Sequence, residues 1–310
     1  MASIGLIANP NSGKNKRNPN ILNEFREILG DKGIIIASSS LENLHASVQN
    51  LKEQKIDIIC INGGDGTIHQ TVTALFSVYG DGPWPQIAIL KGGTMNNIAR
   101  NIGLPLLQNA QSMLRSVMEG GEFRTVVKHP LIVDEKRAGF IYGTSGISAF
   151  LEEYYSGGNP SAVKGAKIGV FSILSALFKG AYASRIFASR PISVNVDDQQ
   201  GHQDHYTNMG ISTLTDIGFY LRPFYHTLKR PDIAHLIAMN CSPLYIVFAL
   251  PKMWLAKPTN SSYIEDMSGQ HISLQFTGEQ SYTLDGDLYP APNTQRIRVG
   301  PPITFIVGRS

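Results

Sequence analysis

The first 125 residues alternate short apolar runs with segments of helical periodicity, and this alternation limits the fold more than any other feature. Apolar runs of strand length occupy residues 4–8, 34–37, 56–61 and 87–90. The first intervening segment repeats apolar side chains at helical spacing, at Ile21, Leu22, Phe25, Ile28 and Leu29. Strands separated by helices pair in parallel, so residues 1–125 are predicted to form an α/β domain with a doubly wound parallel sheet.

The pattern changes from residue 126 onward. In PISVNVDDQQGH the alternate residues Ile192, Val194 and Val196 lie on one predicted strand face, and a polar turn follows. The same pattern recurs around Thr277–Gln280 and in the C-terminal RIRVGPPITFIVG. We therefore expect residues 126–310 to form an antiparallel β domain, with a helical insertion near Lys164–Phe187.

Composition excludes several classes of protein. The 27 basic and 24 acidic residues give a net charge of +3 without a long basic block, which argues against a nucleic-acid partner. Cys60 and Cys241 are the only cysteines, so neither a disulfide framework nor a zinc site is expected. The N-terminal MASIGLIANP is interpreted as a strand rather than a signal peptide, and a soluble cytoplasmic protein is expected.

Two predicted strands are each followed by a similar glycine-rich turn. DIICIN leads into GGDGT and QIAIL leads into KGGT, each at the start of a helix. Ligands of parallel sheets bind beyond the carboxyl ends of the strands, where both turns lie. Glycine reaches positive φ cheaply and admits a ligand to the backbone, and amides at a helix start favour phosphate. Thr67 and Thr94 are expected to cap these helices or to donate hydroxyls to a phosphate.

Asp65 is the unexpected member of the first turn, because a carboxylate repels a bare phosphate. It becomes reasonable if Mg²⁺ lies between the two, since Mg²⁺ is usually held by one or two carboxylates together with phosphate oxygens. Two such turns side by side favour a polyphosphate site over the alternative, a tight turn with a capping aspartate.

The loop NPNSGKNK after the first strand ends at the same edge of the predicted sheet. It is neither a P-loop nor a dinucleotide fingerprint, because Asn15 replaces the Ser/Thr and no GxGxxG occurs. A solvated turn explains this loop almost as well as a ligand site does. Its candidate nucleotide contacts are Asn9, Pro10, Ser12, Gly13 and Lys14.

The motifs NPNSGK, GGDGT, GGTMNNIAR and LDGD occur in the order and approximate spacing of the diacylglycerol kinase catalytic domain family. The chain resembles this family over most of its length, most clearly over residues 5–105. The resemblance implies an ATP-binding domain at residues 1–125, of the type also found in NAD kinases. It further implies a β-sandwich domain at residues 126–310 that completes a cleft and binds a lipid acceptor. The implied activity is Mg²⁺-dependent transfer of the γ-phosphate of ATP to a lipid hydroxyl.

The resemblance also implies roles for individual residues. Asn9 and Gly13 match the first nucleotide loop, and Ser40 falls where the family often has a nucleotide-contacting threonine. The phosphate and Mg²⁺ turn corresponds to Gly63, Gly64, Asp65, Gly66 and Thr67, and the second turn to Gly93, Thr94 and Asn96. Asp285 and Asp287 fall on the family's Asp-Gly-Glu, which supplies the proposed general base. The alternative for Asp285 is an ordinary β-turn, for which Asp-Gly is a common pair.

Several positions depart from the family pattern. Gln70 and Asn97 replace acidic residues, and Asp287 is shorter than the usual Glu. Bacterial members use an acidic segment for a structural Mg²⁺. Because Arg230 and Pro231 in KRPDIAH cannot ligate a metal, no second metal is predicted there. The histidines show no ligand spacing, so a histidine metal cluster is not expected.

The leading hypothesis is a lipid kinase that takes ATP and a lipid acceptor drawn from a membrane surface, with peripheral membrane association. The alternatives are a kinase for a soluble acceptor such as NAD, and a weakly active or non-catalytic nucleotide or lipid sensor. The stretch SPLYIVFALPKMWLAK fits a core helix or strand better than an interfacial patch. The sequence fixes neither the acceptor nor the oligomeric state, for which a homodimer is one candidate.

Overall fold

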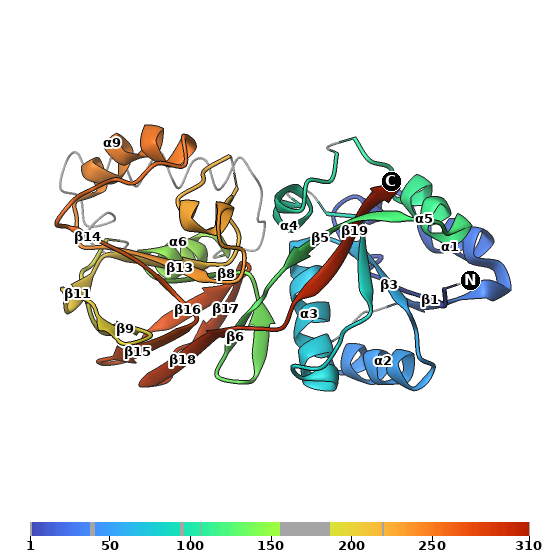
Figure 1. Cartoon of the computed structure of the whole chain (residues 1–310), viewed down its shortest axis with the longest axis horizontal. Helices are drawn as coiled ribbons and strands as arrows, with labels where there is room; N and C mark the ends of the chain where they lie inside the picture. The colour runs from blue at the N-terminus through green and yellow to red at the C-terminus, as the bar shows by residue number, and fades with distance from the viewer. Residues whose placement is uncertain are drawn as a thin grey trace. The chain divides into compact units, whose positions relative to one another are not determined.

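The computed structural model describes residues 2–37, 41–93, 96–105, 107–155, 187–218 and 220–309. The chain forms two compact units (Figure 1). The first contains Met1–Pro130, Lys136–Gly139 and Gly300–Ser310, and the second contains Leu131–Glu135 and Phe140–Val299.

The first unit is built on a six-stranded sheet of order β2-β1-β3-β4-β19-β5. Its strands are β1 (Ile4–Ala8), β2 (Gly33–Ala37), β3 (Ile58–Gly63), β4 (Gln86–Lys91), β5 (Phe123–Lys128) and β19 (Ile303–Arg309). The pairs from β2 to β19 are parallel, and only β5 runs antiparallel to its neighbour β19. The predicted α/β domain with a parallel sheet is confirmed.

Helices cover both faces of this sheet. They are α1 (Ile21–Leu29), α2 (Leu41–Glu53), α3 (Asp65–Tyr79), α4 (Asn97–Asn101) and α5 (Ala110–Glu119), with short 3₁₀ turns η1 (Asn15–Arg17) and η2 (Gly30–Lys32). Phe25 of α1 and Leu114 of α5 share one buried cluster with alternate strand residues such as Leu6. The helix α2 contacts α3, and its Leu51 packs against Gly5 of β1. Because successive residues of a strand face opposite sides of the sheet, α2 lies on the face opposite to Leu6.

The C-terminal strand belongs to the first unit, which corrects the sequence interpretation. Residues 126–310 were expected to form the antiparallel domain, yet β19 lies between β4 and β5 of the first sheet. Ile303, Phe305 and Ile306 are all buried, as expected for a strand covered on both faces. Sequence periodicity does not reveal which sheet such a strand joins, because pairing depends on distant residues.

The second unit is built on two antiparallel sheets, of order β10-β9-β15-β18-β6-β7, with β11 on β9, and β14-β13-β12-β8-β16-β17, although the edge strand β7 itself lies in the part of the chain assigned to the first unit. The strands of the first of these are β6 (Leu131–Val133), β7 (Arg137–Gly139), β9 (Arg190–Val196), β10 (Gln199–Gln200), β11 (His205–Tyr206), β15 (His271–Phe276) and β18 (Thr294–Val299). Those of the second are β8 (Ile141–Ser145), β12 (Asn208–Ser212), β13 (Ala234–Met239), β14 (Ile264–Gly269), β16 (Ser281–Leu284) and β17 (Asp287–Pro290). The helices are α6 (Gly146–Tyr155), η3 (Tyr225–Leu228) and α9 (Pro243–Trp254).

One hydrophobic core joins these two sheets. It includes Val194 and Leu274 from one sheet and Tyr142, Ile211 and Tyr282 from the other. The predicted hairpin after Val196 is confirmed, because β10 pairs with β9. The expected hairpin at Thr277–Gln280 is wrong, since β15 and β16 belong to different sheets and this segment connects them. The predicted helical insertion lies almost wholly outside the described residues.

Within the described part of the chain, each helix is too short or too polar to cross a bilayer.

Candidate functional site

Three loops of the first unit meet where β1, β3 and β4 end. The parallel register aligns Ala8 with Asn62 and Asn62 with Leu90, so the segments that follow these strands emerge side by side. The fully buried Asn62 side chain accepts a hydrogen bond from Asn15 Nδ2 at 2.6 Å and donates to the Leu90 carbonyl at 2.9 Å. The sequence reading missed Asn62 as a site residue, although an asparagine within an apolar strand is a usable signal.

The first loop is tied to both glycine turns by polar side chains. Asn9 Nδ2 donates to Thr67 Oγ1 at 3.1 Å, and Ser12 Oγ donates to the Gly92 carbonyl at 3.1 Å. Asn15 Nδ2 also donates to the Asn9 carbonyl at 2.7 Å. Asn9 and Ser12, predicted as nucleotide contacts, therefore join the three loops to one another.

Close contact, not positive φ, explains most of the glycines in these turns. A Cβ on Gly93 would lie 2.3 Å from Gly64 Cα, and a Cβ on Gly63 would lie 2.4 Å from Thr67 Cβ. None of Gly63, Gly64, Gly66 and Gly93 has a positive φ, so the expected left-handed backbone is wrong here. Glycine is required because the two turns touch through their backbones.

Gly66 is the exception among these glycines. It is the second residue of α3, its φ is not positive, and a Cβ placed on it would meet nothing within 4 Å in the described chain. Alanine is better than glycine in a helix by about 1 kcal/mol, so packing and backbone conformation do not account for this glycine. Open space over a helix N-terminus is what a bound phosphate requires.

The Asp65 carboxylate has protein partners. Its Oδ2 accepts a hydrogen bond from Asn97 N at 3.1 Å, and its Oδ1 accepts one from Ile98 N at 3.2 Å. Asp65 at the start of α3 therefore holds the first turn of α4. The expected capping by Thr67 is wrong, because the N-cap of α3 is Gly64 and no side chain caps it. The Thr67 hydroxyl instead accepts from Asn9.

The second turn ends in a residue with left-handed backbone. Asn96 has φ 50°, and its Nδ2 donates to the Gly93 carbonyl at 3.0 Å. Asparagine tolerates this conformation better than most residues. Thr94 and Ser40, both predicted nucleotide contacts, lie outside the described residues.

A pocket of about 340 Å³ lies beside these loops, and its lining includes Lys14, Asn15, Lys91, Gln108 and Gln111. Burial, followed by the nearby charge of Lys14, lowers the pKa of Lys91. Lys91 Nζ donates to the Pro105 carbonyl. Lys14 itself is exposed, and its backbone amide donates to the Gly92 carbonyl at 2.8 Å. Two lysines thus bring positive charge to the edge of the sheet at which the glycine turns lie.

In the second unit, Asp285 and Gly286 form a two-residue hairpin turn between β16 and β17. Leu284 pairs with Asp287, and φ is 52° at Asp285 and 99° at Gly286, the signs of a type I′ turn. The ordinary β-turn interpretation is therefore right about the backbone. The carboxylate also has a fixed position, because both of its oxygens accept from Phe140 N at 3.0 Å and Oδ1 also accepts from Ile141 N at 2.8 Å.

Asp287 is half-buried in β17, next to this turn. Tyr155 of α6 donates its hydroxyl to the Gly286 carbonyl at 3.2 Å. Burial, followed by the negative charge of Asp287, raises the pKa of Tyr155. The turn that carries both aspartates is thereby anchored to α6.

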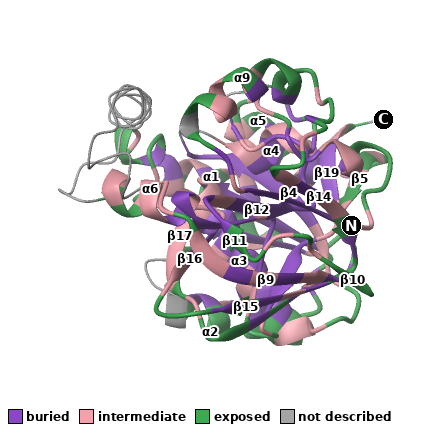
Figure 2. Ribbon diagram, turned by 90° about the vertical axis from the view of Figure 1, so that its left-hand side faces the viewer, coloured by how far each residue is buried: buried purple, intermediate pink, exposed green. Residues whose placement is uncertain are grey.

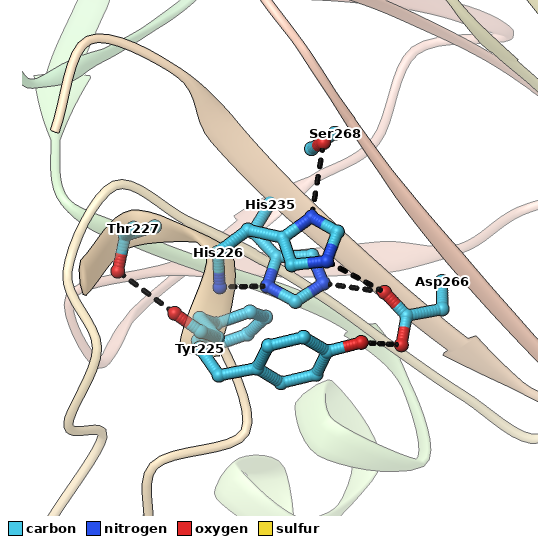
Figure 3. A network of polar contacts seen from close by, with 7 residues as sticks. Tyr225, His226, Thr227, His235, Asp266 and Ser268 are labelled. Carbon is cyan, nitrogen blue, oxygen red and sulfur yellow. Dashed lines mark hydrogen bonds and ion pairs between the residues drawn. The ribbon is translucent and has the colours of Figure 1, made fainter. Parts of the chain in front are cut away.

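A second polar cluster joins η3, β13 and β14 (Figure 3). His235 Nε2 and Asp266 Oδ1 are 2.8 Å apart, and Tyr225 donates its hydroxyl to Asp266 Oδ2. The rings of His226 and His235 stack with centroids 4.4 Å apart, and His226 Nδ1 lies 3.1 Å from Ser268 Oγ. Spacing along the sequence did not predict this cluster, because its residues come from three separate elements.

His226, His235 and Asp266 each offer one ligand atom, and these atoms lie within 4.8 Å of one another. The sequence predicted no histidine metal cluster and gave no sign that these three side chains lie together. The arrangement is nevertheless that of a hydrogen-bonded network, because the two rings are nearly parallel, with 12° between their planes. Ring lone pairs lie in the ring planes, so parallel rings do not converge on one cation. His235 Nδ1 also accepts from the His226 backbone amide at 3.4 Å.

The environment of this cluster shifts the pKa values of His226 and Asp266. Burial, followed by the nearby His235, lowers the pKa of His226. Burial alone would raise the pKa of Asp266, but hydrogen bonds from His235 and Tyr225 outweigh it and lower that pKa. Both shifts favour neutral His226 beside an ionised Asp266 near neutral pH.

The residues of the glycine turns are compatible with Mg²⁺ only when phosphates are present. In the three loop segments, residues 9–18, 62–67 and 91–97, Asp65 is the one acidic residue. One carboxylate does not make a cation site, but one carboxylate with phosphate oxygens and water is a common Mg²⁺ environment. A metal here would accordingly arrive with its nucleotide.

Comparison with known proteins agrees with the resemblance read from the motifs. Residues 3–127 match the family model of the diacylglycerol kinase catalytic domain. Comparison with curated proteins gave no significant match. Among solved structures, one similar chain is a diacylglycerol kinase from Bacillus anthracis str. Sterne, with 17% identity, a TM-score of 0.67, and coverage of 99% of this chain and 97% of that one. A putative diacylglycerol kinase from the same organism has 16% identity, a TM-score of 0.70 and the same coverage.

Proposed function

We propose that this protein, whose residues 3–127 belong to the diacylglycerol kinase catalytic domain family, transfers the γ-phosphate of ATP to the hydroxyl of a lipid. The observation that carries the proposal is Gly66. No residue that the structure describes requires a glycine there, and a phosphate over the start of α3 would. The amides at this helix start and the exposed Lys14 are proposed to bind the nucleotide phosphates.

Further nucleotide contacts are proposed at the loops that meet at this edge. Asn9, Ser12 and Thr67 already hold the loops in register, and this preorganises the amides of the glycine turns. Pro10 and Gly13 lie on the same loop, and Gly64, Gly93 and Asn96 shape the turns that it contacts. Thr94 and Ser40 remain predicted contacts.

Asp65 is the residue that would hold Mg²⁺, which when bound neutralises phosphate charge. The hydrogen bonds from Asn97 N and Ile98 N fix the position of the carboxylate. Each carboxylate oxygen has more than one acceptor direction, so these bonds are compatible with a further contact to a metal or to its bound water.

Asp285 is proposed as the general base. Its carboxylate would accept the proton of the acceptor hydroxyl while the alcohol oxygen bonds to the γ-phosphorus and the bond from that phosphorus to ADP breaks. Two backbone amides hold the carboxylate in place, and rigid placement is what proton transfer requires. Asp287 is proposed as a supporting acid on the adjacent strand.

The test is phosphorylation of a lipid panel with labelled ATP and Mg²⁺, with each product identified by mass spectrometry. A phosphorylated lipid supports the proposal. A product found only among soluble metabolites would assign the protein to a soluble acceptor. Nucleotide binding without transfer to any acceptor would identify a sensor.

The Gly66→Ala variant tests the observation on which the proposal depends. Because the site has room for a Cβ, the variant should be as stable as the parent or more stable by up to about 1 kcal/mol. Nucleotide affinity, measured by calorimetry, should fall at least tenfold because the methyl group occupies the phosphate position. The matched control is Ser77→Ala on the exposed side of α3, which should change neither quantity. Unchanged nucleotide affinity in Gly66→Ala would show that no nucleotide phosphate binds at this helix start.

A further inference from the structure

The helix α9 presents apolar side chains on two sides. Its buried side includes Ala249 and Met253, which pack in a cluster with Phe224 and Ile237. Figure 2 shows exposed residues along the same helix beside these buried ones. The helix is therefore not an ordinary amphipathic surface helix, whose outer side would be polar.

The outer side carries several exposed apolar side chains. Leu244, Phe248 and Leu255 follow one another at helical spacing, and Phe248 is 79% and Leu255 63% exposed. Trp254 and Tyr263 are also exposed, and the Tyr263 ring lies against Tyr245 of α9 with centroids 6.4 Å apart. We call these five exposed residues the α9 patch: Leu244, Phe248, Trp254, Leu255 and Tyr263. An exposed apolar cluster on one segment marks an interaction surface, unlike scattered single residues.

Three cationic residues lie in or beside the segment that carries this patch. Residues 241–264 include Lys252 and Lys257 and no acidic residue. Arg222 adds a third positive charge, because its guanidinium donates to the Trp254 carbonyl at 2.7 Å. Leucine and phenylalanine with a tryptophan, a tyrosine and lysines is the composition of a segment that rests at a membrane interface.

We infer that the α9 patch docks on the surface of a bilayer that contains anionic lipids. The twelve residues of α9 span about 18 Å, well short of the ~30 Å hydrocarbon core, so the helix would lie on the membrane rather than cross it. Apolar side chains would enter the interface while the lysines and Arg222 face lipid phosphates. This inference concerns binding alone and does not depend on the proposed kinase activity.

A second copy of the chain is the less suitable occupant. In a two-fold contact the patch meets its own copy. Lys252 and Lys257 would then approach cations of the partner, and the segment offers no carboxylate to pair them. Anionic lipid supplies the complementary charge that a second patch lacks.

The test uses the full chain without nucleotide. The protein should sediment with vesicles made of equal parts phosphatidylcholine and phosphatidylglycerol. The sedimenting fraction should fall when salt is added or when the vesicles contain phosphatidylcholine alone. Phe248→Glu combined with Leu255→Glu should lower partitioning at least tenfold. The matched control is Leu107→Glu, since Leu107 is 97% exposed in the first unit and should leave vesicle binding unchanged.

A spectroscopic readout keeps the inference falsifiable if a variant folds poorly. The chain has two tryptophans, so Trp84→Phe leaves Trp254 as the only one. Its emission should shift to the blue on addition of the anionic vesicles and be quenched by brominated lipid. Wild-type protein that stays in solution, Trp254 emission that does not respond, or an equal loss in Leu107→Glu would each overturn the inference. So would a wild-type dimer that the double variant converts to a monomer without any vesicle binding.

Discussion

Asp65 in the first unit and Asp285 in the second hold their neighbours in different ways, although each accepts hydrogen bonds from two successive backbone amides. At Asp65 the two oxygens divide the amides, with Oδ2 bound to Asn97 N and Oδ1 to Ile98 N. At Asp285, Oδ1 accepts from both Phe140 N and Ile141 N, and Oδ2 shares the Phe140 amide at 3.0 Å. The two positions therefore differ in how much of the aspartate an asparagine can replace.

The comparison also shows why loss of activity alone does not identify a catalytic aspartate. Both carboxylates maintain local structure, so removal of either one changes the backbone around it as well as the chemistry. An asparagine at residue 285 can keep both amides on its single oxygen, but its NH₂ group then takes the place of the oxygen that shares Phe140 N. At residue 65 an asparagine keeps one bond and turns its own amide toward the second backbone amide.

The largest expected effect is on turnover in Asp285→Asn. Loss of a general base costs about 10²- to 10⁴-fold in rate. Asparagine tolerates the left-handed conformation and can reach both amides through its oxygen, but its NH₂ group replaces the oxygen that shares Phe140 N, so a modest fall in melting temperature is expected. The measurement is steady-state turnover with the acceptor found in the lipid panel, together with a thermal melt.

The control for this variant is Asp198→Asn, an exposed aspartate in the β9–β10 turn, which should leave turnover unchanged. Turnover within a few-fold of the parent in Asp285→Asn would assign the aspartate to the turn alone.

Asp65→Asn should lose turnover and stability together. The substitution removes one hydrogen bond to a charged acceptor and places the NH₂ group of the asparagine against a backbone N–H. Together these changes cost about 1–3 kcal/mol of stability. Urea unfolding measures this loss, and Asp31→Asn, on the exposed η2, is the matched control. Equal stability in Asp65→Asn and Asp285→Asn would break the distinction drawn between the two carboxylates.

Gly93→Ala should destabilise the first unit even though no charge changes. Its Cβ would lie 2.3 Å from Gly64 Cα, so backbone must move, and overpacking of this kind costs about 1–3 kcal/mol. The same exchange at Gly66 should cost nothing. If urea unfolding shows the two alanine variants to be equally stable, the contact between the turns does not explain their glycines.

The smallest expected effect is on the pH dependence of stability, in the cluster around a third carboxylate, Asp266. Unlike Asp65 and Asp285, it is held by side chains, those of His235 and Tyr225. Because burial lowers the pKa of the stacked His226, the unfolded chain takes up a proton first as the pH falls below the ordinary value of 6.5. Stability should therefore fall with decreasing pH, from about pH 6.5 down through the lowered pKa of His226.

His226→Gln removes this titrating group, so its loss of stability over that range should be shallower than that of the parent. Chemical unfolding at several pH values measures the slope. Parallel slopes for the two proteins would contradict the assignment. At lower pH both proteins should lose the contribution of Asp266, because its pKa is also lowered and its stabilising charge disappears as it is protonated.

Much of the fold could be predicted from the sequence, because apolar spacing is a local property. The strand at Ile4–Ala8 and the helix that begins at Ile21 were predicted with these boundaries. The turn at residues 277–280 was not, because its flanking strands look like a hairpin, and only their partners show that they belong to different sheets.

The sequence predicted which types of residue form the candidate site better than it predicted what each residue does there. Glycines, threonine and aspartate after two parallel strands marked the edge of the sheet where the loops do meet. Positive φ at the glycines and capping by Thr67 were wrong. An asparagine within an apolar strand marked Asn62 as unusual, but its partners, Asn15 and Leu90, are set by the tertiary structure and not by local spacing.

The sequence by itself determined the order of strands and helices, the placement of both glycine turns at strand ends, and the absence of acid around α9, since each depends only on neighbouring residues. Only the tertiary structure decided that β19 joins the first sheet, that Gly64 touches Gly93, and that Asp285 holds Phe140 and Ile141. These contacts join residues far apart in the chain. Their partners are fixed by packing and by the need to satisfy buried amides, and neither is expressed in local periodicity.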